Sequence, residues 1–244
     1  MRDAEHRPAF YAARVGGWRD WWTILHPPYT AWHLAYVVIG ASMLPTLDTT
    51  RLVASLLAFF AAVGVAAHAL DERNGHPLST RLSDAALTGA AIAGLVVAVA
   101  FGIAGIVEVG AALIPFVVIG PVLVVAYNLE LFGGALHTDL GFAIAWGAFP
   151  LLTGYVAQRG TVSVAAFVAA FGAAALSFAQ RALSTPARRL RRRVERVDGT
   201  LVLTGGTTEP LGVRALLDPL ERALKALSWA VVALAVALAL THAT

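Results

Sequence analysis

The chain has 244 residues, of which 58% are hydrophobic and 14% are charged, and its mean hydropathy is +0.72. Soluble domains are closer to half apolar and a quarter charged, so this composition places the chain among membrane proteins. It contains no cysteine, which excludes disulfides, thiolate metal sites and a cysteine nucleophile. The pI of 9.7 comes from arginines that flank apolar segments. Anionic lipid and membrane orientation explain basic charge in such places, so we expect no nucleic-acid partner.

The first 28 residues are aromatic and basic, and they lack the continuous apolar core of a cleavable signal peptide. Trp18, Trp21 and Trp22 are typical of side chains that lie at the depth of the lipid headgroups. We therefore expect residues 1–28 to form a cytoplasmic or interfacial segment, followed by an uncleaved first span.

Seven apolar stretches are then long enough, or nearly so, to cross a bilayer core of about 30 Å. They predict an all-α integral membrane protein with a bundle of six helices in residues 29–183 and a last transmembrane helix in residues 223–244. The seven stretches are residues 29–46, 51–70, 85–106, 109–128, 141–157, 162–182 and 224–241.

The basic residues predict the orientation of this bundle. If the N-terminus is inside, 16 of the 18 Lys and Arg residues lie in cytoplasmic segments, and only Arg51 and Arg159 lie outside. This is a strong positive-inside bias. It predicts a multi-pass protein of a prokaryotic plasma membrane, with a cytoplasmic N-terminus and an external C-terminus.

Residues 184–222 are a polar interruption between the last two spans. The segment begins with "STPARRLRRRVERV", continues with "VDGTLVLTGG" and ends with "LGVRALLDPLERALKAL". We predict a small hairpin with a turn at Asp198-Gly199, and then an amphipathic helix that leads into the last span. The segment is too short to bury a core of its own. We expect it to form a lid over the cytoplasmic face or to rest against anionic lipid.

Three polar clusters fall on the same side of the membrane in this topology. In the first, His68, Asp71 and Glu72 have a spacing that places them on one face of a helix. Convergent polar groups at the mouth of a bundle predict a site, whereas the plain alternative is a set of solvated loops. The other two clusters are Tyr127, Asn128, Glu130, His137 and Asp139 after the fourth span, and Gln180, Arg181, Ser184 and the arginine run that follows them after the sixth.

These residue types predict a metal and a phosphate as ligands. Carboxylates suit Mg²⁺, and added imidazoles shift the preference toward Zn, Fe or Mn. Arginines hold phosphate oxygens through paired hydrogen bonds. The predicted metal ligands are His68, Asp71, Glu72, Glu130, His137 and Asp139. The predicted substrate-binding residues are Arg73, Asn74, Arg81, Tyr127, Asn128, Arg181 and the intramembrane His33.

The order of these segments resembles the UbiA superfamily of intramembrane prenyltransferases. The likeness is carried by "ILHPPYTAWHLAYVVIGA", by a second span that ends in a polar motif before "NGHPLS", and by "AYNLELFGG" before "AWGAFPLLTGYVAQRG". The resemblance implies a helical bundle with a cytoplasm-facing cavity. It also implies Mg²⁺-assisted transfer of a prenyl group from an isoprenoid diphosphate to a lipophilic acceptor.

The first aspartate motif of that family, N-D-x-x-D, aligns with residues 67–71. Asp71 matches its last aspartate, His68 stands in place of the first, and Ala67 stands in place of the asparagine. By this resemblance, His68 and Asp71 are the catalytic residues. The second acidic motif is expected where this chain has "SFAQRALSTPARR", which holds no acid, and Asp218 and Glu221 are candidate substitutes before the last span.

Three interpretations remain open from the sequence. The first is a prenyltransferase-like protein that binds an isoprenoid diphosphate or a quinone-like lipid, with membrane lipids as its surroundings. The second is a different metalloenzyme that uses the His/carboxylate set on the same fold. The third is a non-catalytic lipid-binding or scaffold protein. The sequence names no protein partner.

Overall fold

The computed structural model describes residues 7–242, and most of them are helical. Six helices are long and apolar enough to cross a membrane, which confirms an all-α multi-pass membrane protein. They are Thr49–Arg73, Asp84–Val109, Ala111–Asn128, Asp139–Arg159, Val164–Arg193 and Val213–Leu240.

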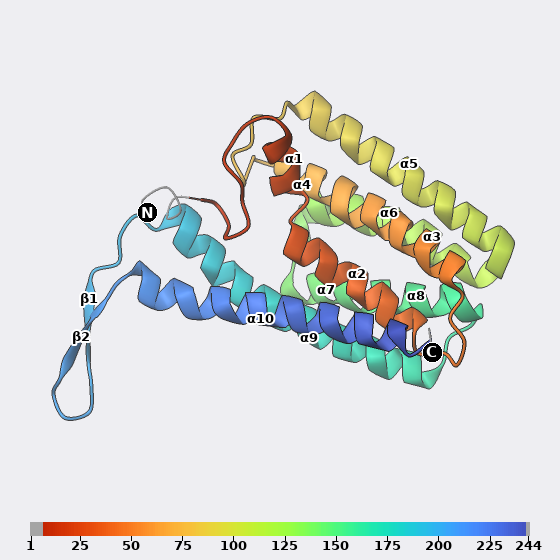
Figure 1. Ribbon diagram of the computed structural model, residues 1–244. Helices are drawn as coiled ribbons and strands as arrows, with labels where there is room; N and C mark the ends of the chain where they lie inside the picture. The colour runs from red at the N-terminus through yellow and green to blue at the C-terminus, as the bar shows by residue number, and fades with distance from the viewer. Residues whose placement is uncertain (1–6, 243–244) are drawn as a thin grey trace.

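The first predicted span is shorter than we expected. It corresponds to α2, Pro27–Ala41, whose 15 residues extend only about 22 Å at 1.5 Å per residue. Helix α2 packs between α8 and α10 near the centre of the molecule (Figure 1). A short seventh helix therefore completes the bundle, but it does not meet the length of the other six.

The first half of the chain forms two long helices after the short α1, Trp18–Ile24, and α2. Helix α3, Thr49–Phe59, continues through a π-helix, Phe60–Ala67, into α4, His68–Arg73. Helix α5, Asp84–Val109, lies on the outside of the bundle (Figure 1). Asp48 and Ser83 cap the N-termini of α3 and α5 with their side chains, which satisfies backbone N–H groups at the helix starts.

The second half adds five more α-helices and a hairpin. A second π-helix, Ile144–Ala148, separates α7 from α8, and short 3₁₀ turns at Ala111–Leu113 and Phe132–Gly134 flank α6. The remaining elements are α6 Ile114–Asn128, α7 Asp139–Ala143, α8 Phe149–Arg159, α9 Val164–Arg193, β1 Gly199–Val202, β2 Thr208–Leu211 and α10 Val213–Leu240.

Residues 184–222 are arranged differently from the predicted lid. Helix α9 continues to Arg193 and α10 begins at Val213, so most of the segment extends the two helices, and the hairpin projects away from the bundle (Figure 1). The predicted turn is also wrong, because Gly199 lies in β1 and pairs with Leu211. The turn lies further along, where Gly205 and Gly206 adopt the positive φ angles that glycine tolerates.

Close helix contacts depend on glycine. A Cβ on Gly40 of α2 would meet the carbonyl of Leu151, and a Cβ on Gly154 of α8 would meet the carbonyl of Val37. Gly94 brings α5 against the first π-helix, where an added Cβ would lie 2.5 Å from the carbonyl oxygen of Ala61. Small residues let backbones approach in this way in lipid, where helix association depends on packing.

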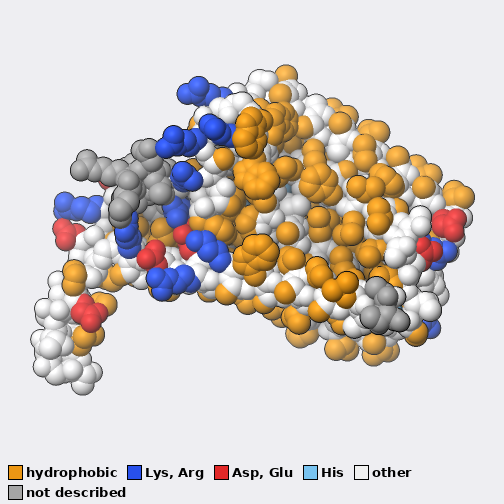
Figure 2. Space-filling view, viewed as in Figure 1, with side chains coloured by type: hydrophobic (Ala, Val, Ile, Leu, Met, Phe, Trp, Pro, Cys, Tyr) orange, Lys and Arg blue, Asp and Glu red, His pale blue; other side chains and the backbone are white. Residues whose placement is uncertain are grey.

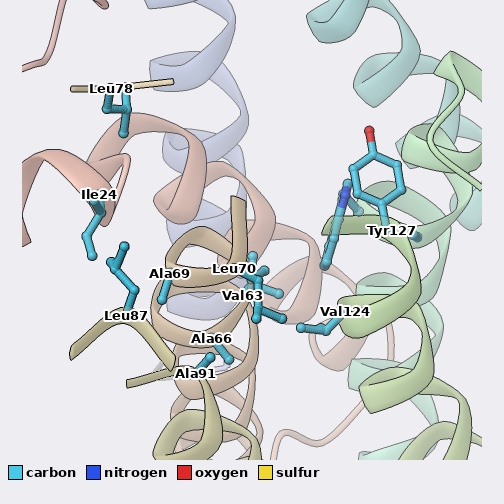
Figure 3. Close-up of a cluster of buried hydrophobic side chains, with 13 residues drawn as sticks. Ile24, Val63, Ala66, Ala69, Leu70, Leu78, Leu87, Ala91, Val124 and Tyr127 are labelled. Atoms are coloured by element: carbon cyan, nitrogen blue, oxygen red, sulfur yellow. The ribbon is translucent and has the colours of Figure 1, made fainter. Parts of the chain in front are cut away.

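Buried apolar side chains fill the contacts between the helices, while the outer surface is largely hydrophobic (Figure 2). The largest buried cluster joins Ile24, Leu87, Val63 and Val124 around the first π-helix and reaches Tyr127 at the end of α6 (Figure 3). Lys and Arg side chains gather toward the end of the molecule from which the hairpin emerges (Figure 2). This distribution separates an apolar body from a charged end.

Candidate functional site

The polar clusters predicted from the sequence lie at one end of the bundle, which we call the basic end. It comprises the N-terminal segment 7–17, α1, the start of α2, α4, the end of α6, the start of α7, the end of α9 and the start of α10. The opposite end comprises the end of α2, the starts of α3, α6 and α9, and the ends of α5, α8 and α10.

Two histidines from different helices stack at the basic end. His26 caps the N-terminus of α2 with φ 46°, and its ring lies 4.3 Å from that of His68 at the start of α4, with 17° between the ring planes. Tyr11 Oη lies 2.7 Å from Nδ1 of His26, and Nδ1 of His68 lies 3.3 Å from the carbonyl oxygen of Gly64 in the π-helix. The N-terminal segment, α2 and α4 thus meet in one cluster.

Burial decides the charge of this cluster. It lowers the pKa of His26 well below its usual value, and His68 adds to the effect because two stacked imidazoles cannot easily both be charged. Burial also raises the pKa of Tyr11 well above its usual value, with a further contribution from Tyr29. Both groups are therefore neutral near neutral pH. Nε2 of His26 has no hydrogen-bond partner among the described residues.

Asp71, on α4, is close enough to two arginines of α9 for their charges to act on it. Arg188 and Arg192 are the charged groups that act on it most strongly. They are one helical turn apart, and they also act on each other with like charge. Asp71 and Arg188 both act on Tyr11 and on Tyr127 as well, so this acid–arginine group joins the histidine cluster to the end of α6.

The second predicted cluster is ordered around Tyr127. Its ring stacks on that of His137 at 4.5 Å, and its hydroxyl accepts a hydrogen bond of 2.7 Å from Nη1 of Arg181. Nε of Arg181 donates to Oδ1 of Asp139 at 2.9 Å. Glu130 lies 3.9 Å from Nδ1 of His137, at an exposed position. Members of the second and third predicted clusters are thus brought together.

Glu72 has a structural role in this arrangement. Its buried carboxylate accepts hydrogen bonds from the backbone N–H of Leu78 at 2.9 Å, from that of Thr80 at 2.9 Å and from the Thr80 hydroxyl at 2.8 Å. Nδ1 of His76 lies 3.6 Å from the same carboxylate. The carboxylate therefore fixes the loop between α4 and α5.

The other predicted substrate-binding residues have different positions. Arg73 and Arg81 are exposed at the basic end, while Nδ2 of Asn74 donates to the carbonyl of Asn128 at 3.2 Å. Asn128 is buried, and its own side chain donates to a carbonyl of α6. His33 lies deeper in the bundle, with Nδ1 2.8 Å from the carbonyl oxygen of Trp146 in the second π-helix.

The N-terminal segment crosses the basic end and is held by α9. Arg191 forms a bidentate ion pair with Glu221 of α10 and donates to the carbonyl of Arg7 at 3.4 Å. Arg192 donates to the carbonyl of Pro8 at 3.2 Å. Glu221, a candidate substitute for the missing acidic motif, is therefore already paired with an arginine. The segment that covers this end is the N-terminal one.

The six predicted metal ligands do not form one coordination shell. Glu72 binds the loop, Asp139 pairs with Arg181, and the charges of Arg188 and Arg192 act on Asp71. Within residues 7–242, no three His, Asp or Glu side chains are placed to hold a metal ion together. Several side chains that were expected to bind a divalent metal have protein partners in this arrangement. The metal stays a prediction.

The larger of the two best-defined pockets lies away from the basic end. It has a volume of about 580 Å³ and lies between α3, α5, α6 and α8, with Asp48, Arg51 and Glu108 at the opposite end of the bundle. Its inner end reaches Val124 and Trp146. The resemblance implies a cavity that faces the cytoplasm, among the three polar clusters. This pocket lies elsewhere in the bundle.

Sequence reasoning missed Tyr11, and it gave Arg188 and Arg192 no individual role. Both arginines belong to the run after the sixth span, which was expected to form a lid or to rest against lipid, although their spacing of four places both on one face of a continuing helix. Tyr11 had no signal beyond its residue type, and the stack of His26 on His68 joins distant segments, so it depends on tertiary packing. No family model, curated protein or solved structure matches the chain.

Proposed function

We propose that the chain is a UbiA-like membrane protein that binds the diphosphate group of an isoprenoid lipid at the basic end. The observation that carries the proposal is the pair Arg188 and Arg192, which lie on one face of α9, act on each other with like charge and have Asp71 and Glu72 as neighbouring carboxylates. Two like charges one helical turn apart and partly buried repel each other, and a bound anion between them relieves that repulsion. A diphosphate supplies several negative charges and acceptor oxygens for guanidinium groups.

The neighbouring groups suit the same ligand. The hydroxyl of Tyr127 is already oriented by Arg181, and the neutral His26 presents an unpartnered Nε2 within the described part of the chain. Transfer of the prenyl group to a lipophilic acceptor is the reaction that the resemblance implies, with His68 and Asp71 as its catalytic residues. A neutral imidazole in this cluster is a base that can take the proton lost by the acceptor.

Magnesium, which the resemblance also implies, is not supported by the donor set as it is arranged. Glu72 and Asp139 accept hydrogen bonds from protein groups, so Asp71 is the acid that remains nearest to the proposed diphosphate position. Arginine is the group that this arrangement offers to the developing charge on the diphosphate. We therefore assign headgroup recognition to Arg188 and Arg192, and we derive no step through a metal.

The test is a titration of the purified full chain, in nanodiscs of neutral phosphatidylcholine, with farnesyl and geranylgeranyl diphosphate. Losing one charge-assisted contact costs about 1.5–3 kcal/mol, which is roughly a 10- to 100-fold loss of affinity. We expect that loss in Arg188→Gln and in Arg192→Gln. Arg189→Gln is the matched control, because Arg189 is the exposed neighbour on the same helix.

The outcomes separate recognition from general charge. Arg189→Gln should bind within about two-fold of the wild type, since one surface charge contributes little in physiological salt. Equal weakening in all three variants would mean that the arginines act only through net charge. Absence of binding by the wild type to either diphosphate would refute the proposal.

A further inference from the structure

The cavity near the opposite end is a feature that the proposed function does not use. It has a volume of about 580 Å³, within the range of small-molecule sites, and it extends from Asp48 and Arg51 to Trp146 inside the bundle. The diphosphate position proposed above lies at the other end of the same helices. Two separate features of the molecule are therefore involved.

Small residues create this space between α3 and α5. Helix α5 touches the first π-helix where Gly94 meets Ala61, and further toward the opposite end α3 and α5 each present several small side chains to the cavity. A stripe of small residues normally allows close packing. Here the space is left open between the two stripes and α6. Among the small residues that line it are Ala54 and Ala58 on α3, Ala62 in the first π-helix, and Ala98, Gly102 and Gly105 on α5.

Aromatic rings form much of the remaining wall. Phe149 lies 6.3 Å from Phe59 and 5.5 Å from Phe116, measured between ring centroids, and all three line the cavity together with Phe101 and Trp146. Such spacings are those of edge and offset ring contacts, so a flat ring can pack among them. Aliphatic side chains of α3, α5 and α6 complete a wall suited to a hydrocarbon tail.

The mouth of the cavity carries one cation against two carboxylates. Nη2 of Arg51 lies 3.4 Å from Oε1 of Glu108, its Nε lies 3.5 Å from Oδ2 of Asp48, and its Nη1 donates to the carbonyl of Gln158 at 3.2 Å. Nε of Arg51 is buried and has no hydrogen-bond acceptor among the described residues. This charge balance repels an anionic headgroup, while the guanidinium of Arg51, with five N–H donors, suits a neutral oxygen acceptor.

We infer that this cavity is a second binding site, for a neutral lipid with a flat ring headgroup that accepts hydrogen bonds. The ring carbonyl lies near Arg51, and the apolar part fills the space toward Trp146. The site is independent of the diphosphate position, and its ligand is distinguished by having no negative charge. A quinone with an alkyl tail is the simplest probe of this class.

The experiment is a fluorescence titration of the full chain, in phosphatidylcholine nanodiscs, with a benzoquinone that carries a decyl tail. Because Trp146 lines the cavity, we expect saturable quenching of tryptophan fluorescence, and most of that signal should vanish in Trp146→Phe. Ala58→Phe fills the cavity and should weaken binding at least about ten-fold, since the ring has no room beside the added side chain. Val53→Phe is the matched control on the same helix, because Val53 is 53% exposed and faces away from the cavity.

Competition distinguishes this site from the first one. Neither farnesyl diphosphate in excess nor the double variant Arg188→Gln/Arg192→Gln should change quinone binding by more than about two-fold. Displacement by the diphosphate would overturn the inference of a separate neutral site, and so would equal displacement by decylbenzene, which has the tail and ring but no acceptor. Linear, unsaturable quenching in the wild type would also overturn it. Wild-type binding and its competition profile do not depend on whether Ala58→Phe folds.

Discussion

Glu72→Ala should destabilise the fold through the loop between α4 and α5. The carboxylate of Glu72 accepts three hydrogen bonds, from two backbone N–H groups and the Thr80 hydroxyl, at 2.8–2.9 Å. A hydrogen bond to a charged group contributes about 1.5–3 kcal/mol, but part of the loss is recovered when water reaches the freed donors. We therefore expect a loss of about 4 kcal/mol in the free energy of unfolding, within the range for breaking a buried charged network.

The assay is thermal unfolding in detergent, followed by tryptophan fluorescence. At about 2–4 °C per kcal/mol for a chain of this size, Tm should fall by roughly 8–16 °C. Glu130→Ala is the control, because its side chain is 55% exposed, and it should change stability by less than about 0.5 kcal/mol. If Glu72→Ala kept the wild-type Tm and instead lost a bound divalent metal, Glu72 would be a ligand, and the structural role assigned to it would be refuted.

Three further predictions concern packing, pH and orientation. Gly154→Ala should destabilise the fold by about 1–3 kcal/mol, because the added Cβ meets the carbonyl of Val37. Gly89→Ala is the control in the same thermal assay. Its added Cβ meets nothing within 4 Å, so this variant should be neutral or stabilising. Because the pKa of His26 is lowered in the folded state, the unfolded chain binds more protons below about pH 6.5. The contribution of His26 to stability should therefore be constant above that pH and fall by about 2 kcal/mol by pH 5. His26→Phe should lose this part of the pH dependence, and an unchanged wild-type slope in the variant would contradict the assignment. The chain has no cysteine, so single cysteine variants test the positive-inside prediction. Ser79→Cys should react with an impermeant maleimide only from the cytoplasmic side, and Thr161→Cys only from outside. The reverse pattern would show that the topology is inverted.

The helical architecture follows from features that the sequence displays directly. Long apolar stretches and polar caps such as Asp48 and Ser163 mark the helices, and composition alone indicates the membrane. The two π-helices are not visible in the pattern, because apolar residues surround them on all sides and no periodicity records an extra residue per turn. Yet they bear on the site: carbonyl oxygens of Gly64 and Trp146, both in π segments, lie near the rings of His68 and His33.

The candidate site was predictable as a location but not as a set of contacts. Loop polarity and helix order place His68, Tyr127 and Arg181 at one end, and the structure brings Tyr127 and Arg181 into direct contact. Which carboxylate remains for a ligand depends on partners that are distant in the chain, as for Asp139 and Arg181. Residue spacing along one helix carries no information about such pairs, so the partners that Glu72 and Asp139 have in the fold could not be predicted from residue types.

The central claim is that the polar ends of separate helices meet at the basic end, and disulfide crosslinking between α2 and α4 tests it most directly. The rings of His26 and His68 stack at 4.3 Å, so we expect cysteines at these two positions to come within reach of each other after small adjustments. In native membranes treated with a mild oxidant, His26→Cys/His68→Cys should form an intramolecular disulfide, detected by its electrophoretic mobility and reversed by reductant. The control pair His68→Cys/His242→Cys joins opposite ends and should not crosslink. Equal or absent crosslinking in both pairs would contradict the convergence on which the proposed site depends.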